Sequence, residues 1–73
     1  MAKLSTSSVY RITEVVGTSR TSWEDAARNA VETAARSLRD LRLAEVTKTD
    51  VVIEKGRVVA FRARVSLSFK YER

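Results

Sequence analysis

The last strand-like stretch of the chain carries the most constraining pattern, a strict alternation of apolar and polar side chains. Every second position is apolar: Phe61, Ala63, Val65, Leu67, Phe69 and Tyr71. The positions between them are polar: Arg62, Arg64, Ser66, Ser68 and Lys70. Because successive side chains of a strand point to opposite faces, this period of two predicts a long strand over residues 57–71. Its apolar row must be covered by another element.

Two other segments are typical of strands. Residues 8–16, SVYRITEVV, are rich in β-branched and aromatic residues, and residues 43–54 carry a similar run. EKGR at 54–57 predicts a tight turn, because Gly56 can adopt a positive φ. GTSRTS at 17–22 predicts a loop, and residues 1–7 predict a loose start.

One amphipathic helix is predicted between the first two strands, over residues 22–41. Its apolar residues recur at helical spacing and are mostly alanine: Trp23, Ala26, Ala27, Ala30, Val31, Ala34, Leu38 and Leu41. A face of small residues lets the helix lie close to a sheet. Thr21 and Glu24 have the spacing of a capping box at the helix start, where Trp23 is predicted to plug the helix end. The opposite face alternates in sign, which is typical of a solvated surface: Glu24, Arg28, Glu32, Arg36 and Asp40.

The predicted fold is α+β, a single domain over residues 1–73 with the element order β-α-β-β. Three antiparallel strands form a sheet wrapped around one helix. A chain of 73 residues buries only about 60% of the surface that its unfolded form exposes. Because the chain has no Cys, disulfides cannot stabilise its small core. Association of subunits is then the remaining way to bury more apolar surface. The first two strands present apolar residues to both sides, which predicts that the second face of the sheet is a subunit interface with polar pockets.

The residue types argue against catalysis. There is no His and no Cys, so the usual zinc ligands and the commonest general base are missing, and Ser or Thr nucleophiles have no such base to activate them. With two glycines, the chain has no Gly-rich phosphate loop; GTS at 17–19 could cradle an anion, although a connecting loop is the simpler interpretation. Calcium needs six to eight oxygens, and a site where subunits meet at a symmetry axis could gather the carboxylates, although a surface role is the simpler interpretation of each: Glu14, Glu24, Asp25, Glu45, Asp50 and Glu54.

The net charge of +5, from 14 basic and 9 acidic residues, allows an alternative function. Together with Arg62 and Arg64 it suggests a small basic nucleic-acid-binding domain. RNA recognition needs aromatic side chains exposed on the sheet, whereas Phe61 and Phe69 share the apolar side of their strand. No stretch approaches the roughly 18 apolar residues of a membrane span, and the N-terminus lacks the pattern of a secretory signal. The absence of Cys fits a cytoplasmic protein.

Four segments together resemble the dodecins. They are VYRITEVVGTS (9–19), SWEDAARNAVETAARSLRDL (22–41), AEV (44–46) and RVSLSF (64–69), so the resemblance covers about residues 9–70. It implies a non-catalytic, hollow homododecamer of cubic symmetry that binds or stores a small ligand. Many dodecins bind riboflavin or FMN, two stacked per pocket at a subunit interface, and are viewed as flavin storage proteins.

The resemblance also implies which residues bind the ligand: Leu43, Glu45 of the AEV corner, and Arg62. Flavin-binding dodecins have a Trp where Leu43 stands and a Gln where Arg62 stands. Leu43 has no π face for stacking, and Arg62 is a donor only, so we predict that flavin binding is weakened or lost. Functional flavin storage is the alternative. An aliphatic residue and an Arg at these positions are similar to the calcium dodecins, as is the GTSRTSWE segment, which makes calcium a candidate ligand without indicating its ligands.

Overall fold

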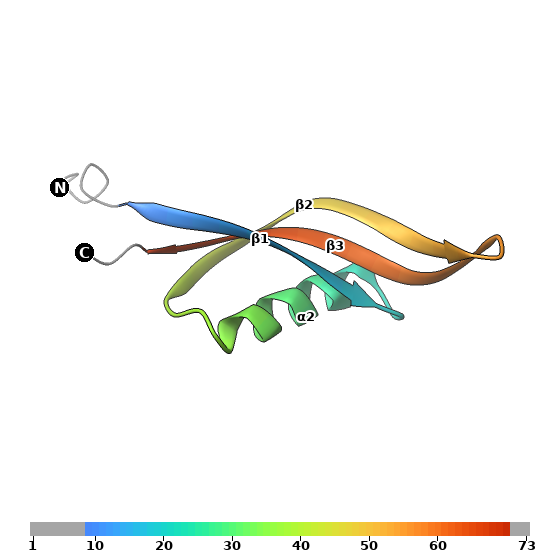
Figure 1. The fold of residues 1–73 in the computed structure, drawn as a ribbon, viewed down its shortest axis with the longest axis horizontal. Coiled ribbons are helices and arrows are strands. Elements are labelled where there is room, and N and C mark those ends of the chain that lie inside the picture. The colour runs from blue at the N-terminus through green and yellow to red at the C-terminus, as the bar shows by residue number, and fades with distance from the viewer. Residues whose placement is uncertain (1–8, 71–73) are drawn as a thin grey trace.

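The computed structural model describes residues 9–70. Four elements follow one another: β1 (Tyr10–Ser19), α2 (Trp23–Ala35), β2 (Leu41–Glu54) and β3 (Arg57–Lys70) (Figure 1). The strands form one antiparallel sheet in the order β1-β3-β2, and α2 covers one of its faces. The predicted β-α-β-β order and fold class are therefore confirmed. The predicted loose start at 1–7 and the prediction for Tyr71 lie outside the described residues.

The core lies between α2 and the central strand β3. Ala63, Val65 and Leu67 are completely buried, as the alternating pattern predicts, because every second side chain of β3 points at the helix. Val65 pairs with Val15 of β1 on one side and with Val46 of β2 on the other. The helix adds mainly small residues to this core, so a single chain buries few large side chains.

Gly17 of β1 is the point where the helix comes closest to the sheet. A Cβ added there would overlap the carbonyl oxygen of Ala26 and lie 2.8 Å from the Cβ of Ala30. Ala26 and Ala30 are buried themselves. The predicted close approach of an alanine-rich helix face is therefore present, and it requires glycine in the opposing strand.

The start of the helix differs from the prediction. The N-cap is Ser22, whose Oγ accepts a hydrogen bond from the Asp25 amide at 3.0 Å, so the proposed capping box of Thr21 and Glu24 is wrong. The Thr21 amide donates instead to Oγ of Ser19, at 2.9 Å. The predicted loop at 17–22 is also too long, because β1 continues through Ser19 and pairs there with β3.

The end of the helix is also earlier than predicted. The α2 helix ends at Ala35 instead of residue 41, and a tighter turn follows in which the Ser37 amide donates to the carbonyl oxygen of Ala34 at 3.1 Å. Asp40 adopts a φ of 56°, the left-handed region that Asp tolerates, and Leu41 begins β2. Leu38 and Leu41 still pack against the core, which explains why the helical spacing of apolar residues continued past the helix.

The hairpin of β2 and β3 extends beyond the other elements (Figure 1). Lys55 and Gly56 both have positive φ, 50° and 75°, as a two-residue hairpin turn requires, so the predicted turn is confirmed. Pairing with β1 stops at Ser19 and Phe61, which leaves residues 52–60, here called the arm, without cover from β1. The radius of gyration is 15.2 Å, against about 11 Å for a compact chain of this length. Within residues 9–70, no helix is long and apolar enough to cross a membrane.

Candidate ligand-binding site

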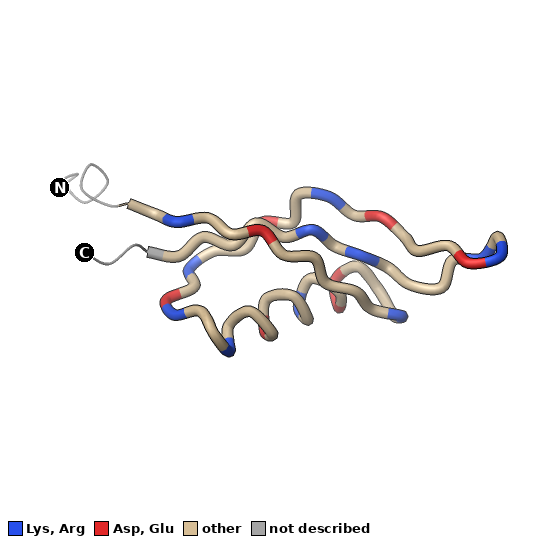
Figure 2. The backbone as a smooth tube through the Cα atoms, in the orientation of Figure 1, with Lys and Arg blue, Asp and Glu red and all other residues tan. Residues whose placement is uncertain are grey.

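The face of the sheet turned away from α2, here called the outer face, carries all three residues singled out in the sequence. Its side chains follow from the strand register and come from all three strands: Tyr10, Ile12, Glu14 and Val16 of β1, Arg62, Arg64, Ser66 and Ser68 of β3, and Leu43, Glu45, Lys48 and Asp50 of β2. Charges of both signs lie along the strands (Figure 2). The predicted mixture of apolar and polar side chains on this face is therefore present.

Leu43 belongs to an apolar strip at one end of the outer face. It pairs with Ser68 of β3, and Ile12 of β1 pairs with the same serine from the other side. Leu43 and Ile12 are 64% and 65% exposed, although both are large aliphatic side chains. One chain therefore leaves the strip uncovered, and the strip offers contact area without an aromatic ring.

Glu45 lies next to this strip in the following row of the sheet. It pairs with Ser66, which is flanked on its other side by Glu14. Both glutamates are exposed, and the carboxylate of Glu14 lies 3.8 Å from the Arg64 guanidinium. Glu45 is thus the carboxylate nearest to Leu43 along β2, and it is open to a partner from outside the chain.

Arg62 is held by a carboxylate of its own chain. Its Nε donates to Oδ1 of Asp50 at 2.7 Å, and its Nη2 donates to Oδ2 at 2.8 Å, which is a two-point contact. The hydrogen bond and charge of Arg62 hold the pKa of Asp50 below its ordinary value, and the same contact raises the pKa of Arg62. Two of the donors of Arg62 are therefore already engaged.

Trp23 fixes the position of this ion pair, which the sequence did not reveal. Its indole Nε1 donates to the backbone oxygen of Asp50 at 3.0 Å. Its ring meets Phe61 edge to face, with 5.2 Å between the centroids. The side chain still exposes 43% of its surface. Trp23 therefore packs at the helix start as predicted, but it also ties the first turn of α2 to β2.

Comparison with known proteins identifies the family. Residues 9–72 match the family model described as dodecin. The chain belongs to the dodecin family. The calcium dodecin of Mycobacterium tuberculosis is 40% identical over 63 residues, which are 86% of this chain and 89% of that protein. The resemblance found in the sequence is confirmed.

Solved dodecin structures share the fold. The dodecin of Streptomyces coelicolor superposes with a TM-score of 0.85 at 42% identity, covering 92% of this chain and 96% of that one. The crystal structure of the calcium-chelating calcium dodecin from Mycobacterium tuberculosis, reported with a novel calcium-binding site, superposes with a TM-score of 0.77 at 38% identity. That match covers 88% of this chain and 91% of the other.

Within one subunit of this dodecin, the predicted ligand-binding residues form two separate groups. Leu43 and Glu45 are neighbours on the outer face of β2. Arg62 lies six residues along β3 from Ser68, the partner of Leu43, which is about 20 Å along a strand. The roles of these residues stay predictions. A pocket that used all three would have to combine more than one subunit.

The acidic side chains of one dodecin subunit do not fit a calcium ion. Among the described residues, no three carboxylates lie close enough together to hold a metal ion. Asp50 is bound to Arg62, and Glu14 faces Arg64. Because calcium takes six to eight oxygens, one subunit cannot complete its coordination with these groups.

The nucleic-acid alternative loses its main supports on the same face. Arg62 and Arg64 each face a carboxylate, which lowers the positive potential that would attract phosphates. Phe69 is buried on the helix side, with the Arg11 guanidinium 5.5 Å from its ring centre, so it cannot stack on a base.

Proposed function

We propose that this dodecin assembles into a hollow homododecamer that binds or stores a small ligand or ion where subunits meet, without catalysing a reaction. The observation that carries the proposal is the uncovered apolar strip of Leu43 and Ile12 on the outer face. Exposed aliphatic side chains in contiguous groups mark sites of association or ligand binding. A cytoplasmic location stays a prediction from the sequence.

We further propose that flavin binding is weak or lost. Leu43 can fill space beside a flavin but cannot stack on it as an aromatic ring does. Arg62 would have to break its two short bonds to Asp50, at 2.7 and 2.8 Å, before its Nε and Nη2 could bond a flavin edge. Charge-assisted bonds of this kind are roughly twice as strong as neutral ones, so the exchange is unfavourable.

A titration with riboflavin tests this part of the proposal, because stacking quenches free flavin emission. We expect no quenching at micromolar wild-type protein and clear quenching by the double variant Leu43→Trp, Arg62→Gln. The matched control is Glu32→Trp, which adds a Trp to an exposed position of the solvated helix face and should leave emission unchanged. Quenching by the wild-type protein would instead support the alternative, a functional flavin storage dodecin.

Calcium is the other candidate ligand, because a close relative carries that name. Since one subunit does not provide a fitting donor set, a bound calcium ion would have to be shared by subunits around a symmetry axis. Glu45 is the exposed carboxylate beside the apolar strip and is our proposed contributor. Calorimetry with CaCl₂ should show binding that Glu45→Gln abolishes and Glu32→Gln, on the solvated helix face, preserves. Unchanged binding in Glu45→Gln would remove Glu45 from the site.

Light scattering of the purified protein tests the shell itself. We expect a mass of about 12 subunits, because membership of the dodecin family implies a dodecamer. Closed symmetry is also the usual form of a homo-oligomer. A stable monomer at micromolar concentration would contradict the proposal as a whole, whatever the ligand.

A further inference from the structure

The arm carries a pair of exposed aliphatic side chains that its own chain does not cover. Ile53 of β2 and Val58 of β3 pair directly across the hairpin, and they are 61% and 54% exposed. The start of α2 is the end of the helix nearer the arm, and it lies well short of the hairpin turn (Figure 1). Neighbouring Val59 is exposed as well. The arm therefore presents a compact apolar knob, defined here as Ile53 and Val58.

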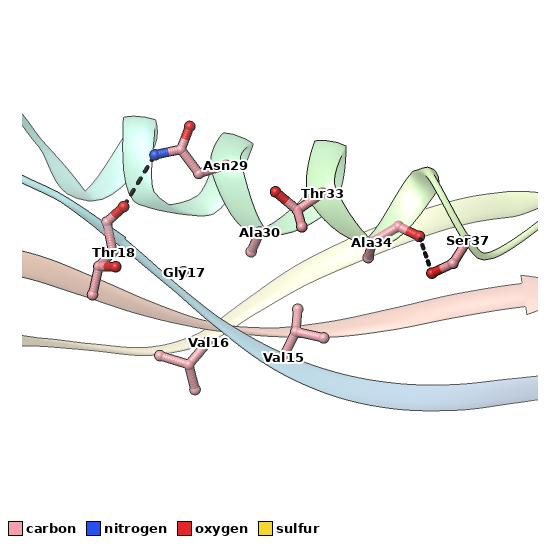
Figure 3. Close-up of a pocket in the computed structure, with 9 residues that line it drawn as sticks. All are labelled: Val15, Val16, Gly17, Thr18, Asn29, Ala30, Thr33, Ala34 and Ser37. Carbon is pink, nitrogen blue, oxygen red and sulfur yellow. Dashed lines mark hydrogen bonds between the residues drawn. The ribbon is translucent and has the colours of Figure 1, made fainter.

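A second uncovered feature lies between α2 and β1. A cavity of about 380 Å³ opens there beside β1, which is an edge strand of the sheet. Its lining combines a small-residue floor with a polar rim: Val15, Gly17, Ala30 and Ala34, with Asn29, Thr33 and Ser37 (Figure 3). The floor is deep because Gly17 and the two alanines have almost no side chain.

The chemistry of the cavity suits an apolar protein side chain better than a polar ligand. No charged side chain is among its lining residues. The rim groups are partly engaged within the chain, because Asn29 Nδ2 donates to the Thr18 carbonyl oxygen at 3.0 Å and Ser37 Oγ donates to that of Ala34 at 3.5 Å (Figure 3). A polar ligand would find few convergent hydrogen-bonding groups there.

The knob cannot fill the cavity of its own chain. Val15 in the cavity wall pairs with Val65, and Val58 lies seven residues further along β3, about 23 Å away. A second copy is the occupant that both features fit, since every copy carries one knob and one cavity. Contiguous exposed aliphatic side chains mark sites of association, and Ile53, Val58 and Val59 form such a group on the arm.

We propose that the arm of one subunit inserts Ile53 and Val58 into the cavity between α2 and β1 of the next subunit. This contact rests on the homo-oligomer proposed above and specifies one of its interfaces. Knob and cavity are different surfaces, so the contact is head to tail. Head-to-tail contacts close into rings of three or more subunits, whereas a symmetric pair would bring two equal surfaces together.

Engineered cysteines test the contact in the full-length protein, which has no cysteine of its own. The double variant Ile53→Cys, Thr33→Cys places one thiol on the knob and one on the cavity rim. Both positions are exposed, so the core is left intact. Mild oxidation, or a short bismaleimide, should join subunits into a covalent series beyond the dimer on a denaturing gel. Each single variant alone should remain monomeric on the gel, and co-expressed single variants should give covalent dimers.

Three results would overturn this inference. Cross-linking of Ile53→Cys alone would show arm meeting arm, and cross-linking of Thr33→Cys alone would show cavity meeting cavity. Absence of cross-links from the double variant with either reagent, in a protein that light scattering shows to be oligomeric, would mean that a small molecule or another contact covers the cavity. In that last case the proposed shell stands and only the arm contact fails, whereas a monomer by light scattering refutes both.

Discussion

Replacing Gly17 with alanine should be among the most damaging small changes in this protein. The added methyl group would overlap the carbonyl oxygen of Ala26 and come within 2.8 Å of the Cβ of Ala30. Both obstacles belong to the backbone or to an atom next to it, so no side-chain rotation relieves them. The helix would have to move away from β1, and it would carry the buried contacts of Ala26 and Ala30 with it.

The cost follows from that displacement. Overpacking a close contact destabilises a protein by about 1–3 kcal/mol, and a clash with backbone belongs at or above the upper end. A chain of this length has a free energy of unfolding of roughly 4–11 kcal/mol, so about 3 kcal/mol is a large share of it. With a urea m-value of about 1–3 kcal/mol/M, the denaturation midpoint should fall by roughly 1–3 M.

The matched control is Gly56→Ala in the hairpin turn. That glycine has nothing within 4 Å of an added Cβ, but its φ of 75° disfavours a side chain, which costs about 1–2 kcal/mol. Both variants should be unfolded in urea at the same protein concentration, because association contributes to the apparent stability. If Gly17→Ala were no less stable than Gly56→Ala, close contact between α2 and β1 would not be a determinant of this fold.

Three further predictions concern the core, the ion pair and the indole. Leu67→Ala should lower stability by about 2–5 kcal/mol in urea, whereas Leu43→Ala should leave each subunit intact and weaken only association, measured by light scattering on dilution. The low pKa of Asp50 predicts stability that is complete above the ordinary Asp value and lost as the pH falls through the folded value. The stability difference between wild type and Asp50→Asn, measured by urea unfolding, should therefore stay constant above about pH 5 and shrink as the pH falls below the ordinary Asp value of 3.8; a difference that stays constant there too would exclude the ion pair with Arg62 as its cause. Trp23→Phe keeps an aromatic ring but loses the hydrogen bond to the Asp50 backbone, so urea unfolding should show a loss of about 0.5–1.5 kcal/mol, and no loss would contradict the bond.

The sequence predicts the fold correctly where a single periodic pattern of apolar residues corresponds to a single buried face. The alternation around Val65 and Leu67 placed the central strand and its buried face correctly, because the period of two is uninterrupted between Phe61 and Phe69. The alanine stripe of the helix indicated close packing, and Gly17 provides the room for it. Gly56 indicated the hairpin turn correctly, because the turn requires a positive φ at that position.

The helix boundaries could not be predicted, because tertiary contacts decide them. Leu38 and Leu41 keep helical spacing but reach the same core from a turn and from a strand. At the other end, the hydroxyl of Ser19 donates to Asp25 at 2.8 Å and accepts from the Thr21 amide, which moves the N-cap to Ser22. The helix end has no signal in the local sequence. Its start has two competing ones, because Ser22 and Asp25 have the spacing of an N-cap motif and so do Thr21 and Glu24, one residue earlier.

The ion pair of Asp50 and Arg62 depends on a register shift between β2 and β3 that could not be predicted from the sequence. From the turn, a regular hairpin pairs Glu54 with Arg57 and Ile53 with Val58, and continued unchanged it would place Asp50 opposite Phe61. The structure shifts by one residue between Val52 and Ile53, which brings Asp50 opposite Arg62 instead.

A second shift, between Val46 and Lys48, reverses the first. There the hydroxyl of Thr47 donates to the Arg64 carbonyl oxygen at 3.3 Å. Because a shift of one residue exchanges the two faces of a strand, this shift keeps Leu43 and Asp50 on the same outer face although they lie an odd number of residues apart. The outer face therefore has an uncovered apolar strip at Leu43 and, about 20 Å along the strands, an arginine that is already bound to Asp50. The hydrogen bonding of Arg62 is thus set by strand register as much as by residue identity, because the hairpin places Asp50 opposite Arg62.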